Sequence, residues 1–180
     1  MSKKSGFVAI VGRPNVGKST LLNKILQQKI SIISDKVQTT RHRIRGIHTE
    51  ERGQIIFIDT PGLHKPFHKL GEFLVDEAKL AIPDADCVIF IVDIQDPPGP
   101  GDKWIAESIL DYDKPVILAL NKVDKVKKQS LKENNREKYL NLFKDKKITS
   151  LMISAETGRN IEDLVKNLFR NLPEGPYFYP

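Results

Sequence analysis

Five short apolar runs are spaced along the chain, and polar loops and amphipathic segments separate them. Each run is rich in Val and Ile and nearly continuous, which is typical of strands buried on both faces of a parallel sheet. A weaker alternating run, Arg43–Thr49, shortly precedes the second of them and predicts a hairpin with one antiparallel strand at the sheet edge. The five runs are Phe7–Val11, Ile55–Ile58, Cys87–Val92, Val116–Leu120 and Ile148–Ile153.

Segments with helical spacing lie between the apolar runs. Pro83 is predicted to end the second helix, because proline cannot continue a helix, and Asn160 is predicted to cap the fifth. Strands that alternate with helices predict a doubly wound α/β sheet, in which ligands bind at the carboxyl ends of the strands. The predicted helices are Lys18–Leu26, Glu72–Ile82, Asp102–Leu110, Leu131–Phe143 and Ile161–Leu172.

The first strand leads into a complete phosphate-loop motif, Gly-x4-Gly-Lys-Ser, at residues 12–19. Its glycines let successive backbone N–H groups point at phosphate oxygens, and the following helix adds its positive N-terminal end. We expect Lys18 to reach the β- and γ-phosphates and the Ser19 hydroxyl to bind Mg2+. The motif's placement between an apolar strand and an amphipathic helix disfavours an ordinary strand-to-helix turn. The predicted phosphate-binding residues are Gly12, Arg13, Pro14, Asn15, Val16, Gly17, Lys18, Ser19 and Thr20.

Two further segments are expected to contact the metal and the γ-phosphate. The second apolar run ends in Asp59-Thr60-Pro61-Gly62, where the acid can hold the magnesium hydration shell and the Gly62 N–H can face the γ-phosphate. Alone, these four residues also fit a simple turn. In the polar stretch before the edge strand, Thr40, in preference to Thr39, is predicted to join Ser19 and Asp59 as a magnesium ligand.

The fourth apolar run is followed by Asn121-Lys122-Val123-Asp124, which predicts recognition of guanine. The Asp124 carboxylate can accept from N1–H and N2–H of guanine, a donor pair that adenine lacks. Asn121 can either accept from the far edge of the base or tie this loop to the phosphate loop, and the stem of Lys122 can lie along the ring. After the last run, Ser154-Ala155-Glu156 offers a backbone N–H for the guanine carbonyl. A polar turn is the alternative in both places.

Composition restricts the class of protein further. The chain has 180 residues, 39% apolar and 29% charged, which fits a single soluble domain. No apolar run approaches the roughly 20 residues of a membrane span, and no signal peptide is evident, so a cytoplasmic location is predicted. The formal charge of 29 − 23 = +6 fits an anionic partner such as RNA. The single cysteine, Cys87, is predicted to be a buried core residue.

With these motifs the chain resembles the translation-factor-related GTPases, and among them the Era family of ribosome-assembly GTPases. The most specific segments are Gln38–His42 and the Leu-Pro-Glu-Gly-Pro tail that starts at Leu172. The resemblance implies a Ras-like fold with a mostly parallel six-stranded sheet, one antiparallel edge strand and about five helices on both faces. It also implies binding and hydrolysis of GTP with Mg2+ in a switch that serves small-subunit assembly and associates with 16S rRNA.

The same resemblance divides the chain into a GTP-binding domain, residues 1–172, and a linker, residues 173–180. Family members carry a C-terminal RNA-binding KH domain, which would begin after Pro180 and which nothing in this chain matches. Some members also associate peripherally with the inner face of the cell membrane, although no residue pattern here indicates it. A monomer is expected.

One position departs from Ras-like enzymes. Where those place a Gln that orients the attacking water, this chain has Leu63. Leucine cannot orient water, so slow intrinsic turnover is predicted. In related potassium-activated GTPases an Asn at the position of Asn15 holds a monovalent cation, and this resemblance implies the same role here. The alternative is an Asn that merely suits the loop backbone. The predicted catalytic set is Lys18, Thr40, Gly62 and Asn15.

The sequence also fits two other functions. The chain can be a GTP sensor whose hydrolysis is negligible until a partner activates it, which Leu63 favours. It can also be a GTPase of the same superclass that serves tRNA modification or large-subunit assembly.

Overall fold

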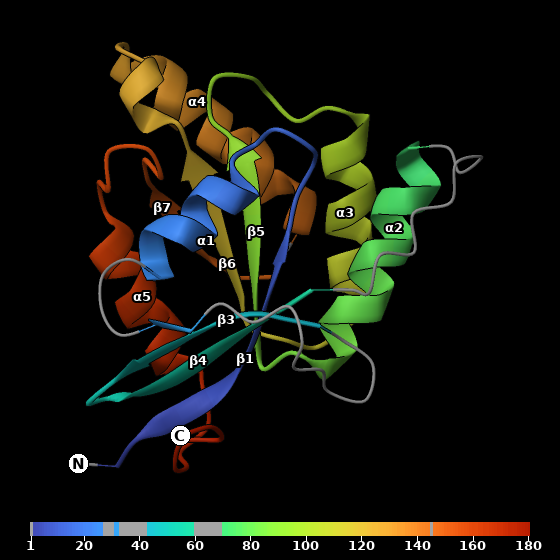
Figure 1. Cartoon of the computed structure of the whole chain (residues 1–180). Coiled ribbons are helices and arrows are strands. Elements are labelled where there is room, and N and C mark those ends of the chain that lie inside the picture. Colours follow the sequence, from blue (N-terminus) through green and yellow to red (C-terminus); the bar gives the residue numbers. More distant parts are fainter. Residues whose placement is uncertain (1, 27–30, 33–42, 60–69, 145) are drawn as a thin grey trace.

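The described part of the chain folds around one sheet, in which the central strand leads directly into the phosphate loop (Figure 1). The computed structural model describes residues 2–26, 31–32, 43–59, 70–144 and 146–180. The strands are β1 (Lys4–Val11), β2 (Ser31–Ile32), β3 (Arg43–Glu50), β4 (Gly53–Asp59), β5 (Cys87–Asp93), β6 (Val116–Asn121) and β7 (Thr149–Met152). The helices are α1 (Lys18–Leu26), α2 (Leu70–Ala81), α3 (Pro100–Leu110), α4 (Gln129–Leu140) and α5 (Ile161–Arg170).

The sheet order is β2-β3-β4-β1-β5-β6-β7. β1 pairs in parallel with both β4 and β5, and β5, β6 and β7 continue in parallel. β3 is antiparallel to β4, which confirms the predicted hairpin and the α/β class. However, β3 is not at the edge, because β2 pairs with its outer side. A strand of two residues carries no alternation, so the sequence pattern did not predict it, and the described sheet has seven strands rather than six.

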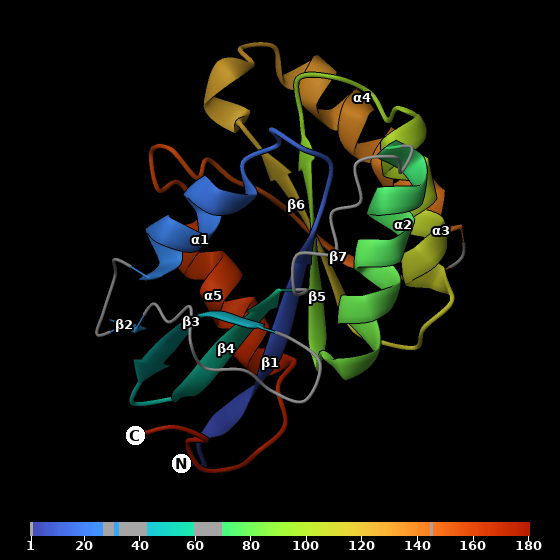
Figure 2. The same cartoon turned by 45° about the vertical axis from the view of Figure 1, so that its right-hand side comes forward.

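Two hydrophobic layers sandwich the sheet. In β1, Val8 packs with the cluster under α1 and α5, whereas the adjacent Ala9 packs with the cluster under α2, α3 and α4. This alternation follows from the two-residue repeat of a strand and explains why both faces are apolar. Figure 2 shows α1 and α5 on one face of the sheet, with α2 and α3 on the other. Cys87 is buried in β5, as predicted. None of the described helices is long and apolar enough to cross a membrane.

Helix boundaries differ from the predicted ones where local chemistry intervenes. α3 begins at Pro100, since the fixed φ of proline suits the first helical turn. The predicted fourth helix ends at Leu140 and continues as a 3-10 turn, η3 (Asn141–Phe143). The prediction that the Asn160 side chain caps α5 is wrong. Asn160 has φ 61° and makes no capping bond, and its Nδ2 donates to the Met152 carbonyl at 2.6 Å.

The predicted linker, residues 173–180, folds back and packs against the N-terminal ends of strands β1 and β4. Gly175 N donates to Lys3 O at 2.9 Å, and the Phe178 ring lies 5.4 Å from the Phe7 ring. The fully buried Gln54 accepts from the backbone amides of Phe178 and Tyr179. Both termini therefore lie at the same end of the molecule (Figures 1 and 2). That this segment leads towards another domain remains a prediction.

Candidate nucleotide-binding site

The phosphate loop joins β1 to α1 at the carboxyl end of the central strand. Two glycines are required there by close packing. A Cβ on Gly12 would lie 2.6 Å from the Ile91 carbonyl oxygen. Gly17 has a backbone φ of +112°, and a Cβ there would lie only 2.3 Å from Asn121 Nδ2. Lys18 Nζ folds across the loop and donates to the Gly12 carbonyl at 2.9 Å. The loop thus closes around its own lysine, and contact of Lys18 with phosphates remains a prediction.

Asn15 occupies a left-handed backbone conformation, with φ 67°. Asparagine tolerates this region better than most residues, so Asn15 suits the loop backbone, and a role of its side chain in holding a cation remains a prediction. Pro14, Asn15, Ser19 and Thr20 are all exposed. Val16, by contrast, is buried in the cluster beneath α1 and anchors the loop to the core.

Arg13 was predicted among the nucleotide-binding residues, but its side chain is engaged elsewhere. Its Nε donates to Oδ1 of Asp102 at 3.0 Å, and Asp102 is fully buried at the start of α3. Burial alone would lower the pKa of Arg13, yet the charge and hydrogen bond of Asp102 outweigh it and the pKa is raised. The Arg13 side chain therefore fastens the phosphate loop to α3. No pattern in the sequence points to Asp102, because nothing local marks a helical Asp as the partner of a distant Arg.

Asn121 joins the phosphate loop to the loop that follows β7. Its Nδ2 donates to the Val16 carbonyl at 2.9 Å, and its Oδ1 accepts from Ala155 N at 2.9 Å. Asn121 is 3% exposed, so both bonds are shielded from water. Of the two roles that the sequence left open, the structure shows the tie between loops. Contact of the Ala155 region with the base remains a prediction, with this amide already engaged by Asn121.

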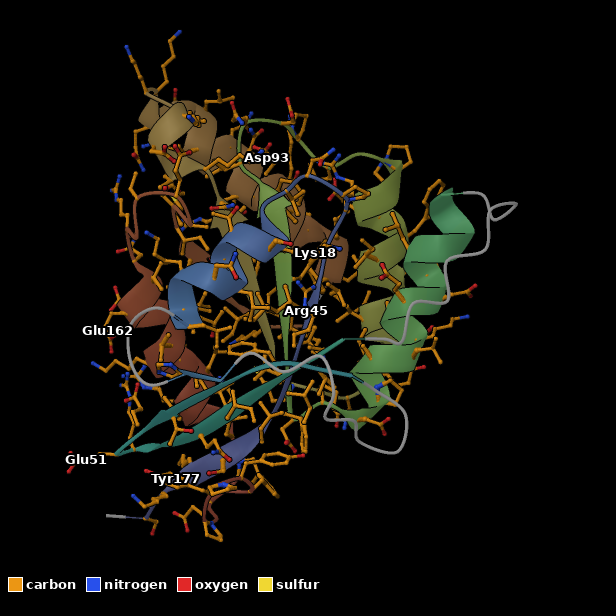
Figure 3. The ribbon with its side chains drawn as sticks, in the orientation of Figure 1. Lys18, Arg45, Glu51, Asp93, Glu162 and Tyr177 are labelled. Atoms are coloured by element: carbon orange, nitrogen blue, oxygen red, sulfur yellow. The ribbon has the colours of Figure 1, made fainter. Side chains whose placement is uncertain are left out.

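Lys122 makes a second connection to the phosphate loop. It has φ 70°, and its Nζ donates to the Asn15 carbonyl at 3.0 Å and lies 3.2 Å from Oδ2 of Asp93. Asp93 ends β5, where its Oδ1 also accepts from Gln95 N at 2.9 Å. Figure 3 shows Asp93 beyond Lys18 at the same end of the sheet. The only sequence signal for Asp93 is its place as an acid at the end of an apolar strand.

A cavity of about 240 Å3 lies between these loops. Asp124, exposed on the 3-10 turn η2 (Val123–Lys125), contributes a carboxylate to it. The predicted phosphate-loop, Asn-Lys-x-Asp and Ser-Ala-Glu segments thus meet around one space, although they lie more than 30 residues apart in sequence. The cavity is lined by Gly17, Thr20, Gln95, Asn121, Lys122, Asp124, Lys125, Ser154, Ala155 and Glu156.

The predicted magnesium ligands are described only in part. Ser19 is exposed on the first turn of α1, and Asp59 ends β4, which runs parallel to β1. A serine hydroxyl and an aspartate carboxylate are hard oxygen ligands of the kind that Mg2+ prefers. Thr39, Thr40, Thr60, Pro61, Gly62 and Leu63 lie outside the described residues, as does the Asp59 side chain.

A phosphate loop at the centre of a mostly parallel sheet, with a cavity whose wall includes Asp124, defines a P-loop GTPase. Residues 7–122 match the family model described as 50S ribosome-binding GTPase. The chain belongs to this GTPase family.

The comparisons with individual proteins extend over the whole chain. It is 47% identical over 182 residues to the GTPase Era of Alkaliphilus metalliredigens, covering 100% of this chain and 60% of that protein. Among solved structures, it is 40% identical to an Era in complex with MgGDPNP and nucleotides 1506–1542 of 16S ribosomal RNA. The TM-score is 0.78, and the match covers 99% of this chain and 60% of that chain. An Era variant from Aquifex aeolicus bound to GDP and AlF4− is also 40% identical, with a TM-score of 0.77. This match covers 98% of this chain and 60% of that chain. The chain therefore spans 60% of the length of these relatives.

Proposed function

We propose that this chain binds GTP with Mg2+ and hydrolyses it to GDP and phosphate, as the switch domain of a protein that acts in small-subunit assembly. The observation that carries the proposal is the cavity lined by both Asp124 and Asn121. The Asn121 side chain links this cavity to the phosphate loop through its hydrogen bond to the Val16 carbonyl. The bridge fixes the distance between a base-reading carboxylate and the phosphate-binding amides. The relatives bound to GDPNP or GDP support the same ligand class.

In this proposal the residues of the chain bind and orient the nucleotide. Asp124 accepts hydrogen bonds from N1–H and N2–H of guanine, while Lys18 exchanges its contact with the Gly12 carbonyl for phosphate oxygens. Water attacks the γ-phosphorus in line, the bond to the β–γ bridging oxygen breaks, and that oxygen leaves with GDP. Lys18 and the loop amides stabilise the developing charge. Ser19, Asp59 and Thr40 would hold Mg2+, which would neutralise further negative charge on the phosphates.

Base selectivity gives the direct test. Calorimetry of the purified chain should show tight GDP and GTP binding and none for ATP. Asp124→Asn should lose guanine affinity and gain xanthine affinity, because the carbonyl at position 2 of xanthine suits an amide donor. Asp111→Asn, which removes an exposed carboxylate at the end of α3, is the matched control and should bind GDP like the parent. Equal uptake of ATP and GTP would contradict the proposal.

The second candidate is a GTP sensor that hydrolyses only with a partner. Leu63, at the place of the water-orienting Gln of Ras-like enzymes, favours it. Single-turnover hydrolysis with and without ribosomal particles separates the two. A measurable rate for the chain alone supports the enzyme, whereas a rate only in the presence of particles supports the sensor.

We also propose that potassium assists hydrolysis through the Asn15 side chain. The test compares turnover in potassium and sodium salts. Because Asn15 has φ 67°, Asn15→Ala would strain the loop, and Asn15→Gly is the better variant, since glycine adopts this conformation freely. We expect Asn15→Gly to abolish the difference between the two salts while GDP binding persists. Equal rates for the parent in both salts would rule out the role.

The proposed macromolecular partner is the small ribosomal subunit and its 16S rRNA, reached mainly through a KH domain beyond this chain. Support comes from the related Era that was solved with 16S rRNA nucleotides. The family description names the 50S subunit instead, so large-subunit assembly is the competing function. Co-sedimentation of the full-length protein with purified 30S and 50S subunits in GTP distinguishes them.

We further propose a monomer located in the cytoplasm, with peripheral association at the inner face of the cell membrane. Analytical ultracentrifugation tests whether the protein is a monomer. Fractionation of cells that express the full-length protein, with and without a high-salt wash, tests the cytoplasmic location and the peripheral membrane association.

A further inference from the structure

A groove of about 720 Å3 lies at the end of the molecule opposite the phosphate loop, where the chain begins, the β3–β4 hairpin turns and α5 ends. In Figure 3, Glu51 and Tyr177 lie at this end, while Lys18 and Asp93 lie far from it. Five of its lining residues are basic, and one is acidic. The charged lining residues are Lys3, Lys4, Arg52, Lys166, Arg170 and Glu51.

Most of this positive charge is not compensated within the described residues. Lys3 Nζ donates to the Glu51 carbonyl at 3.0 Å and lies 3.3 Å from the Tyr177 hydroxyl, and Lys4 Nζ donates to the Arg170 carbonyl at 3.4 Å. These acceptors are neutral, so they orient the ammonium groups without cancelling their charge. Several cations held near one another repel, and a polyanion laid along the groove would relieve that repulsion.

Arg52 is held differently from the other cations. Its guanidinium contacts the carboxylates of Glu50 and Glu162 and stacks 4.9 Å from the centre of the Phe169 ring. These contacts fix the hairpin turn against α5 and so keep the two walls of the groove in place. The groove is therefore built by packing, rather than formed by a chance cluster of mobile lysines.

Exposed aromatic rings adjoin the cations. The Tyr177 ring lies 4.7 Å from Lys3 Nζ, and the neighbouring Phe178 is 56% exposed. Proteins that bind single strands combine a positive groove for the backbone with aromatic rings on which bases stack. A flat bilayer surface could not reach cations on both walls of a concave groove, and one phosphate group would not engage cations spread over three segments.

We propose that this groove binds the phosphate backbone of single-stranded RNA, with Tyr177 as a stacking platform. The choice of RNA rests on the proposed function, in which ribosomal RNA is the partner. The groove thereby assigns an RNA contact to this chain itself, separate from any further domain. No motif marks it in the sequence, because its cations come from the N-terminus, the hairpin turn and α5.

Fluorescence anisotropy of the 180-residue chain with a labelled single-stranded RNA of about 12 nucleotides tests the proposal. We expect binding that weakens between about 50 and 200 mM salt, with a log–log slope near −2 for roughly three phosphate contacts. The triple variant Lys3→Ala, Lys166→Ala, Arg170→Ala should bind at least about tenfold more weakly, with a slope approaching zero. The control triple Lys127→Ala, Lys128→Ala, Lys147→Ala removes the same charge from exposed positions elsewhere and should stay within about threefold of the parent.

A second pair of variants examines stacking. Tyr177→Phe keeps the ring and should bind RNA like the parent, whereas Tyr177→Ala should bind about fivefold or more weakly. No RNA binding by the parent, equal losses in the two triple variants, or competition by phosphatidylserine vesicles as strong as that by unlabelled RNA would each overturn the assignment. GTP hydrolysis by the groove variants is measured in parallel. The groove variants should hydrolyse GTP like the parent. A parent chain that hydrolyses GTP but binds no RNA would show that the groove assignment is wrong while the proposed GTPase function stands.

Discussion

Arg13 and Asp102 are 89 residues apart in sequence, yet Arg13 Nε and Asp102 Oδ1 lie 3.0 Å apart in the fold. Asp102 is completely buried, and its second oxygen, Oδ2, accepts from Gly99 N at 2.9 Å, so one carboxylate both holds the phosphate loop and closes the first turn of α3. On the other side, Asn121 and Lys122 bond to the carbonyls of Val16 and Asn15. The phosphate loop is therefore held from two sides, by α3 and by the loop that contains Asn121 and Lys122.

The first prediction concerns this pair. Asp102→Asn keeps an acceptor for Gly99 N but removes the charge that holds Arg13, so the free energy of unfolding should fall by about 1–3 kcal/mol. GDP should dissociate faster, because one anchor of the phosphate loop is lost. Urea unfolding and stopped-flow release of a fluorescent GDP measure the two effects. Glu107→Gln, exposed on the same helix, is the control. Unchanged GDP release in Asp102→Asn would show that the pair serves the fold alone.

The second prediction concerns Gly17. Gly17→Ala would place a Cβ 2.3 Å from Asn121 Nδ2 in a backbone conformation with φ +112°. The Asn121 amide must then move, and its bonds to the Val16 carbonyl and Ala155 N are lost. We expect at least about a tenfold loss of GDP affinity, since two buried hydrogen bonds are each worth about 1 kcal/mol. Gly175→Ala, where a Cβ meets nothing within 4 Å, is the control. Normal GDP affinity in Gly17→Ala, measured by calorimetry, would contradict this.

The third prediction concerns the C-terminal segment. Gln54 Nε2 donates to Thr49 Oγ1 and to the Tyr179 carbonyl, while Oε1 accepts from two backbone amides of the segment. Gln54→Ala should release residues 177–180 and lower the free energy of unfolding by about 1–3 kcal/mol. Chymotrypsin should then cleave after Tyr177 or Phe178 sooner than in the parent. Thr49→Val removes only one of the bonds and should leave cleavage nearly unchanged. If Gln54→Ala is cut no faster than Thr49→Val, Gln54 does not retain the segment.

The fourth prediction is a pH dependence. Burial alone would raise the pKa of Glu50, but its hydrogen bonds with His48 and Arg52 outweigh burial and lower it. A carboxyl whose pKa is lower in the folded state stabilises the fold above its unfolded pKa of about 4.3, and this stabilisation is lost as the pH falls through the folded value. Glu50→Gln should therefore lower the free energy of unfolding near neutral pH, and the difference should shrink as the pH falls below about 4.

Urea unfolding of the parent and of Glu50→Gln, from about pH 3 to about pH 7, measures this difference. Glu137→Gln, on the exposed side of α4, removes a carboxylate away from this cluster and is the control. A difference between the parent and Glu50→Gln that stays constant down to the lowest pH would mean that Glu50 stabilises the fold through shape rather than charge.

The sequence by itself determined the class of fold, the order of the elements and the main segments of the candidate site. These follow from local causes: strands buried on both faces must be continuously apolar, and a phosphate-binding loop requires glycine at positions such as Gly17. Such signals lie within a few neighbouring residues, so they can be read before the chain is folded.

Only the tertiary structure decided which of the predicted site residues also hold the scaffold together. Arg13 turned out to hold α3, Asn121 to bridge two loops, and the C-terminal segment to lie against Gln54, 125 residues away from its Tyr179 contact. The basic groove is likewise assembled from three separate segments. The physical reason is that a buried polar or charged group must find a partner, and the packing of the sheet and helices, not proximity in sequence, determines which partner is within reach.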